Sequence, residues 1–144
     1  MSKPRTRAEL RRLVIARAHG CCEYCWSQAR YSSHYFAIEH IIPKRRGGRT
    51  TLGNLAFSCQ GCNNHKHIKI KALDPLTRKY APLYNPRRHE WSEHFTWSAG
   101  CLEIIGLTPT GRATVRALQL NREEVVNLRR VLSASGEHPP TIAL

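Results

Sequence analysis

The sequence of 144 residues contains no apolar run that approaches the roughly 20 residues of a membrane-spanning helix. Its first ten residues, MSKPRTRAEL, are charged and lack the apolar segment of a secretory signal. We therefore expect a cytoplasmic protein with no membrane partner. In that compartment the six cysteines would stay reduced and be available to metal, which argues against a disulfide framework.

Acidic residues are also scarce, because 10 Asp and Glu stand against 23 Lys and Arg, and Asp74 is the single aspartate. The formal net charge is +13 at pH 7, and 17 of the 23 cations are Arg. Arg presents a planar fork that binds phosphate oxygens in pairs, so this composition favours a nucleic-acid partner. Hydrophobic residues make up 41% of the chain, which is enough for one modest core.

The hydrophobic pattern predicts an α+β protein folded as a single domain of three parts. Residues 1–20 are expected to form a basic N-terminal helix, which starts with a capping box of Thr6 and Glu9 and ends at Gly20. Residues 21–73 are expected to form the core. Residues 74–144 are expected to form an extension of unknown role.

Within the core, residues 35–42 and 55–58 have the composition of strands, joined by a basic loop that contains glycine. A helix of two to three turns is expected after Cys62, ending before Asp74.

The extension is expected to begin with an irregular connector at 74–93. A hairpin around residues 98–100 and two helices near 110–120 and 122–133 would follow. Asn121 is expected to cap the last helix.

Four cysteines form two C-x-x-C pairs, Cys22 with Cys25 and Cys59 with Cys62. Four thiolates match the tetrahedral all-cysteine sites that hold structural zinc. Thioredoxin-type redox chemistry is an alternative, but it uses one such pair rather than two. Cys21 competes with Cys22, although Cys22 reproduces the spacing of the second pair. We therefore expect one structural Zn²⁺ bound by these two pairs.

The segment between the cysteine pairs resembles the HNH endonuclease family, in the subtype with two zinc knuckles around a ββα-metal motif. The resemblance rests on EHIIPKRRGG and GNLAFSCQGCNNHK, which contain Glu39–His40, Pro43, Gly47–Gly48, Asn54–Leu55 and Cys59-x-x-Cys62-Asn63-x-x-Lys66. It implies a ββα-metal core stabilised by the four-cysteine zinc site. It also implies metal-dependent hydrolysis of phosphodiester bonds in DNA.

The residues of this segment have the chemistry that phosphodiester hydrolysis needs. A neutral imidazole such as His40 can take a proton from water at neutral pH. Glu39 and Asn63 offer hard oxygen ligands for a divalent ion, and neighbouring strand residues point to opposite faces. The resemblance implies the same roles, and it assigns Asn54 to bracing the loop and orienting the base. His67, four residues after Asn63, is a candidate further ligand on the same helix face.

Two positions differ from the commonest pattern of the family, since Glu39 stands in place of Asp and Asn63 in place of His. Both keep oxygen ligands, which favours Mg²⁺ or Mn²⁺ over Ni²⁺ or Zn²⁺ as the catalytic ion.

Basic side chains around these residues are expected to contact DNA phosphates with weak sequence preference. They are Lys44, Arg45, Arg46 and Arg49 in the loop and His65 and Lys66 on the helix, with Arg112, Arg116, Arg129 and Arg130 as further candidates. Two alternatives remain open. One is a non-catalytic zinc module that binds nucleic acid. The other is an interaction protein that uses Trp91, Trp97 and the C-terminal helices. The sequence predicts no oligomeric state.

Overall fold

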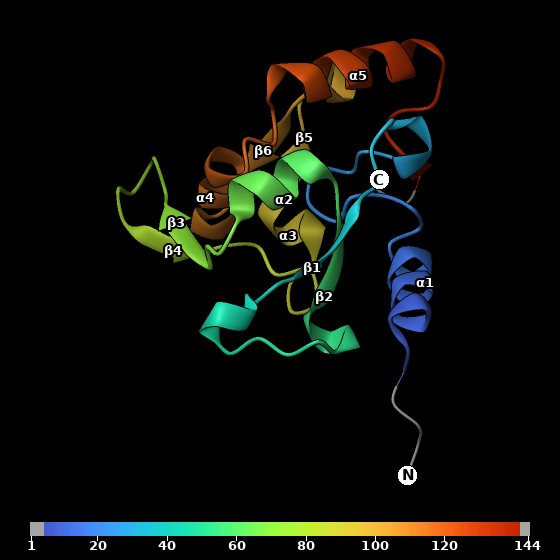
Figure 1. Cartoon of the computed structure of the whole chain (residues 1–144). Helices are drawn as coiled ribbons and strands as arrows, with labels where there is room; N and C mark the ends of the chain where they lie inside the picture. Colours follow the sequence, from blue (N-terminus) through green and yellow to red (C-terminus); the bar gives the residue numbers. More distant parts are fainter. Residues whose placement is uncertain (1–4, 142–144) are drawn as a thin grey trace.

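The computed structural model describes residues 5–141 and shows short helices and three separate two-stranded antiparallel sheets in that range (Figure 1). The helices and strands, in chain order, are α1 (Arg7–Arg17), β1 (Ala37–His40), β2 (Leu55–Ser58), α2 (Gln60–Lys66), β3 (Lys71–Leu73), β4 (Tyr80–Pro82), α3 (Trp91–His94), β5 (Phe95–Trp97), β6 (Ile104–Gly106), α4 (Pro109–Ala117) and α5 (Glu123–Ala134). None of the helices in residues 5–141 has the length and apolar character needed to cross a membrane.

Helix α1 starts as its sequence predicts. The Thr6 hydroxyl accepts a hydrogen bond from the Glu9 amide at 3.1 Å, and the Glu9 carboxylate accepts one from the Thr6 amide at 2.8 Å. This reciprocal capping box satisfies two amide groups that the first turn leaves without partners. The helix ends at Arg17, three residues earlier than expected, and Gly20 follows in the left-handed region at φ 71°.

Strands β1 and β2 form the hairpin on which the candidate site is built. Their antiparallel register pairs Glu39 with Ala56 and His40 with Leu55. Every residue of β2 is buried, so this strand anchors the hairpin in the core. The Ile41 amide donates to the Asn54 carbonyl at 2.9 Å, which extends the pairing past the end of β1.

Helix α2 differs from the prediction in both position and length. It begins at Gln60, before Cys62, because Cys59 is its N-cap and the Cys59 sulfur accepts from the Cys62 amide at 3.4 Å. It ends at Lys66, since His67 has φ 49°, outside the helical region. The expected helix up to residue 73 is therefore wrong.

The connector at 74–93 is more ordered than its prolines indicate. Strand β3 pairs with β4, with Ala72 opposite Ala81, and α3 follows. Asp74, which follows β3 in the chain, is buried. Both of its carboxylate oxygens accept hydrogen bonds from the Arg112 guanidinium, at 2.9 and 3.0 Å. The ion pair ties the β3–β4 hairpin to α4, so Arg112 is held by a carboxylate rather than left open to phosphate.

The hairpin of β5 and β6 and the two C-terminal helices confirm the predicted order of the extension. Asn121 does not cap α5, however. Its side-chain oxygen accepts from the Ile104 amide at 2.7 Å, and its side-chain nitrogen donates to the Ile104 carbonyl at 2.8 Å. Arg122 occupies the N-cap position without a side-chain hydrogen bond. A long-range bond to β6 has thus replaced the local cap.

Candidate metal centre and candidate active site

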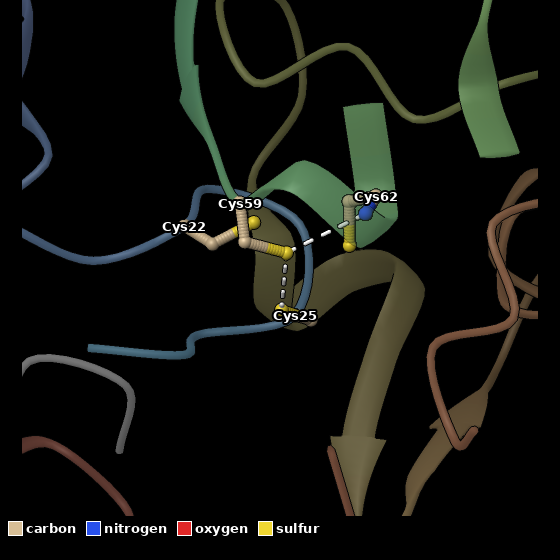
Figure 2. A group of neighbouring side chains, drawn as sticks. All are labelled: Cys22, Cys25, Cys59 and Cys62. Carbon is tan, nitrogen blue, oxygen red and sulfur yellow. Dashed lines mark hydrogen bonds between the residues drawn. The ribbon is translucent and has the colours of Figure 1, made fainter. Parts of the chain in front are cut away.

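The two C-x-x-C pairs converge in the interior. Cys22 and Cys25 come from the loop after α1, and Cys59 and Cys62 come from the start of α2 (Figure 2). All four residues are buried, and their sulfur atoms lie within 4.8 Å of one another. A tetrahedral zinc ion with bonds of about 2.3 Å would hold its sulfurs about 3.8 Å apart. The expected ligand set fits zinc in number, chemistry and spacing, and Cys21 lies outside it.

His40 lies at the end of β1, where the basic loop begins. Its Nε2 is 2.8 Å from the Thr50 hydroxyl, so the far end of the loop fixes the ring. Burial, followed by the charges of Lys44 and Lys66, lowers the pKa of His40 below its ordinary value. The imidazole is therefore neutral at pH 7, which is the protonation state of a general base.

Asn54 braces the loop that leads away from His40. Its side-chain oxygen accepts from the Ile42 amide at 2.8 Å, and its side-chain nitrogen donates to the carbonyls of Ile42 and Arg49, at 3.0 and 2.9 Å. Gly48 is needed at this crossing, because a Cβ there would lie 1.6 Å from the Ile42 oxygen. The arrangement agrees with the bracing role, while the direct partner of the His40 ring within residues 5–141 is Thr50.

Glu39 points away from His40 into the core, as alternation along a strand requires. Its Oε2 lies 3.3 Å from the Lys66 ammonium, and the Tyr24 hydroxyl donates to its other oxygen. Burial raises the pKa of Glu39 although Lys66 and Tyr24 act in the opposite direction. The Glu39 side chain is only 4% exposed. In this arrangement Lys66 and Tyr24 are the partners of the two carboxylate oxygens.

Residues 22–69 match the family model described as HNH endonuclease. This third of the chain is similar to HNH endonucleases. The match includes both cysteine pairs, the β1–β2 hairpin and α2, and it confirms the family resemblance of the sequence. Comparison with curated proteins and with solved structures gave no match.

The other expected ligands of the HNH segment lie on or just beyond α2. Asn63 is half-buried on the helix, and His67 is exposed after its end. Because the helix stops at Lys66, the spacing argument that places His67 on the same face as Asn63 does not extend to it. Within residues 5–141 the four cysteines are the one group of three or more Cys, His, Asp or Glu side chains close enough to share an ion.

The basic loop of the HNH segment is exposed throughout its charged positions, which are Lys44, Arg45, Arg46 and Arg49. The Arg46 guanidinium donates to the Ile68 carbonyl at 2.8 Å, which holds the loop against the chain after α2. His65 is half-buried on α2. Lys66 lies in the core and donates to the Ile41 carbonyl at 2.8 Å, so it is not on the surface that the loop forms.

The extension contributes an arginine to the zinc cluster that the sequence did not reveal. Arg122 Nη2 lies 3.3 Å from the Cys59 sulfur, and Nη1 lies 3.6 Å from the Cys62 sulfur. Gly61 makes room for it, because a Cβ there would lie 2.4 Å from Nη2. Burial acts to lower the pKa of Arg122, yet the neighbouring thiolates raise it, Cys62 most strongly. The guanidinium therefore offsets thiolate charge, and Gly61 in the second knuckle was the only sequence signal for it.

Another arginine, Arg129 of α5, binds the backbone of the first C-x-x-C pair. Arg129 is 3% exposed, and its Nη2 donates to the carbonyls of Cys25, at 3.3 Å, and Leu120, at 2.8 Å. Arg129 is therefore a packing residue of the zinc region and not a surface contact for DNA.

Proposed function

We propose that the protein is a DNA endonuclease of the HNH type in which His40 activates the attacking water. One observation carries the proposal: a neutral, loop-anchored imidazole stands at the end of β1 inside the matched HNH segment. An exposed basic loop begins immediately after it. A water-activating base beside cations that bind phosphate is the minimum that phosphodiester hydrolysis requires.

The hydrogen bonds of His40 define how the ring would work. The Thr50 hydroxyl contacts Nε2, and in the tautomer that carries its proton on Nε2 the free Nδ1 would accept the proton of the water. A neutral ring that donates Nε2–H to the Thr50 oxygen has its free lone pair on Nδ1. Asn54 fixes the backbone between Ile42 and Arg49, so the loop keeps the spacing between the base and Thr50.

The loop cations would position the DNA. Lys44, Arg45 and Arg49 are exposed beside His40 and would contact phosphates on either side of the scissile bond. Contacts to phosphate set the register on DNA without reading its sequence, so we expect weak sequence preference.

A divalent ion, Mg²⁺ or Mn²⁺, supplies charge stabilisation at the phosphate and the leaving oxygen when it is bound. Asn63 and His67 are the accessible members of the expected ligand set. Glu39 is held by Lys66 and Tyr24 and supports β1 from the core side, so no catalytic step is assigned to a metal ion on Glu39.

Zinc is proposed as a structural ion that joins the loop after α1 to the start of α2. These two segments lie on either side of the β1–β2 hairpin in the sequence, so one ion closes the HNH segment at both ends. Structural zinc of this kind adds directly to folding free energy.

Plasmid nicking tests the proposal. Zinc-loaded wild type would be compared with His40→Ala in EDTA, Mg²⁺, Mn²⁺ and Ni²⁺, with His34→Ala, an exposed histidine outside the site, as the matched control. Wild type and His34→Ala should nick the plasmid, and His40→Ala should bind DNA and zinc without cutting. Absence of nicking by wild type under every metal condition would overturn the enzyme proposal in favour of the non-catalytic zinc module.

A further inference from the structure

A cavity of about 690 Å³ lies apart from the His40 loop. It is bounded by the end of α1, the first zinc knuckle and residues 84–97. All three tryptophans of the sequence, Trp26, Trp91 and Trp97, contribute to its walls.

The aromatic wall is built from rings that contact one another. The ring centroids of Trp26 and Trp91 are 5.9 Å apart, and those of Trp91 and Trp97 are 5.6 Å apart. The Trp91 indole also donates to the Tyr24 carbonyl at 3.4 Å, which fixes its orientation. Fixed aromatic rings that border an open volume are the platforms on which nucleobases stack.

Cations accompany the rings. Arg17 and Arg88 line the cavity, and Arg87 lines it while paired with the carboxylate of Glu23. Arg88 is exposed, and its side chain makes no hydrogen bond or ion pair within the part of the chain that the structure describes. The ion pair with Arg87 neutralises the carboxylate of Glu23 on the cavity wall, although the exposed Glu90 also borders the cavity. Arg88 is left as an available phosphate partner.

Two donors of the lining residues lack an acceptor. Trp26 Nε1 and Arg87 Nη1 are shielded from solvent and make no hydrogen bond among residues 5–141. A shielded donor without a partner costs free energy, and these two side chains would have to turn towards the cavity before a bound base could accept from them.

The cavity is connected to the strand that faces His40. Arg17, on its wall, donates to the Leu55 carbonyl at 2.7 Å and to the Leu52 carbonyl at 2.9 Å. Leu55 is the register partner of His40. Arg17 therefore belongs both to the wall of the cavity and to the support of the strand that pairs with β1.

We propose that the tryptophan cavity binds an unpaired nucleobase of DNA, stacked against its rings, with the adjoining phosphate at Arg88. The proposal rests on the proposed function only in taking DNA as the substrate, since binding requires no cleavage. A duplex keeps its bases paired inside the helix, so the cavity would favour single-stranded or locally opened DNA.

Tryptophan emission tests this directly, because every tryptophan of the chain lines the cavity. Zinc-loaded His40→Ala would be titrated with a single-stranded oligodeoxythymidylate of about eight nucleotides. The same length of duplex and of oligouridylate would be run beside it. The single strand should quench the emission and bind more tightly than the duplex. Arg88→Ala should weaken binding. Trp26→Ala should weaken it by roughly 5- to 150-fold, the range expected for the loss of one stacked base.

Arg78→Ala, at an exposed arginine between β3 and β4 that does not line the cavity, is the matched control and should bind as the parent does. Trp26→Phe keeps a ring and would retain most of the affinity, and zinc content would verify that each variant is folded. The proposal is overturned if the single strand leaves the emission unchanged, if the duplex or the oligouridylate binds as tightly, or if Arg88→Ala has no effect. If the single strand quenches the tryptophan emission but wild type nicks no plasmid, the nuclease proposal is refuted and the proposal of base binding in the cavity is retained.

Discussion

The ammonium of Lys66 lies 3.3 Å from a carboxylate oxygen of Glu39, and the two side chains are 2% and 4% exposed. Lys66 comes from α2 and Glu39 from β1, so the ion pair joins the two elements that frame His40. Lys66 also donates to the Ile41 carbonyl, the residue that follows His40. The backbone at the candidate base is therefore held from the core side by a buried charge pair.

Replacing Lys66 with Met should destabilise the fold by about 3–5 kcal/mol, because the Glu39 carboxylate would remain buried without its cation. The double change Glu39→Gln with Lys66→Met should recover part of this loss. Urea unfolding of the zinc-loaded proteins measures both. Lys69→Met, at an exposed lysine, is the control. A loss below about 1 kcal/mol for Lys66→Met would place the pair among weak surface interactions instead.

Arg122→Ala should weaken zinc binding by about 10- to 100-fold, as loss of an outer partner of a metal ligand does. The reason is that Nη2 and Nη1 contact the sulfurs of Cys59 and Cys62. Competition with a chromogenic chelator measures the affinity. Gly61→Ala should act in the same direction, since its methyl group would displace the guanidinium. Equal affinities for Arg122→Ala and Arg130→Ala would show that the contact does not support the metal.

The pH profile of cleavage should show an acid limb whose midpoint lies below the ordinary histidine pKa of about 6.5. The proposed base His40 would act in its neutral form, and its lowered pKa keeps it neutral to lower pH. Lys44→Gln removes one of the charges that lower this pKa, so the midpoint should move to higher pH. Rates at limiting DNA across a pH series measure it. A midpoint unmoved by Lys44→Gln would contradict the electrostatic coupling.

Asn54→Ala should lower both stability and cleavage while leaving zinc bound. It removes one acceptor and two donor interactions of the loop, and each buried group left unpaired costs about 1–3 kcal/mol. Asn54→Asp keeps the acceptor for the Ile42 amide and loses both donors, so it should also impair the loop. Thermal unfolding, zinc content and nicking rate would be measured on the same samples. Full cleavage activity in Asn54→Ala would contradict the proposed role of Asn54 in bracing the loop.

Local sequence signals predicted the features that depend on local chemistry. The capping box of α1, the β1–β2 hairpin and the four-cysteine set follow from residue types at fixed spacings. The family match confirms the HNH resemblance of the segment that contains two of these features.

The features that the sequence did not predict depend on partners far along the chain. Asn is a residue type that commonly caps helices, but the Asn121 side chain forms hydrogen bonds with the Ile104 backbone instead. From the sequence, Lys66 resembles a surface cation on a basic helix, but in the structure it is buried in an ion pair with Glu39. Arg122 reaches the zinc cysteines across about 60 residues of sequence, and no local pattern encodes such a contact.

The most direct test of the central claim is the single-turnover cleavage rate of His40→Ala relative to wild type, with each protein in excess of the DNA and at a concentration that binds all of it. A general base contributes about 10²- to 10⁴-fold to the rate, so the variant should lose a factor in this range. Its affinity for DNA and its zinc content should be unchanged. A His40→Ala protein that cleaves fully bound DNA at the wild-type single-turnover rate would contradict the assignment of His40 as the base.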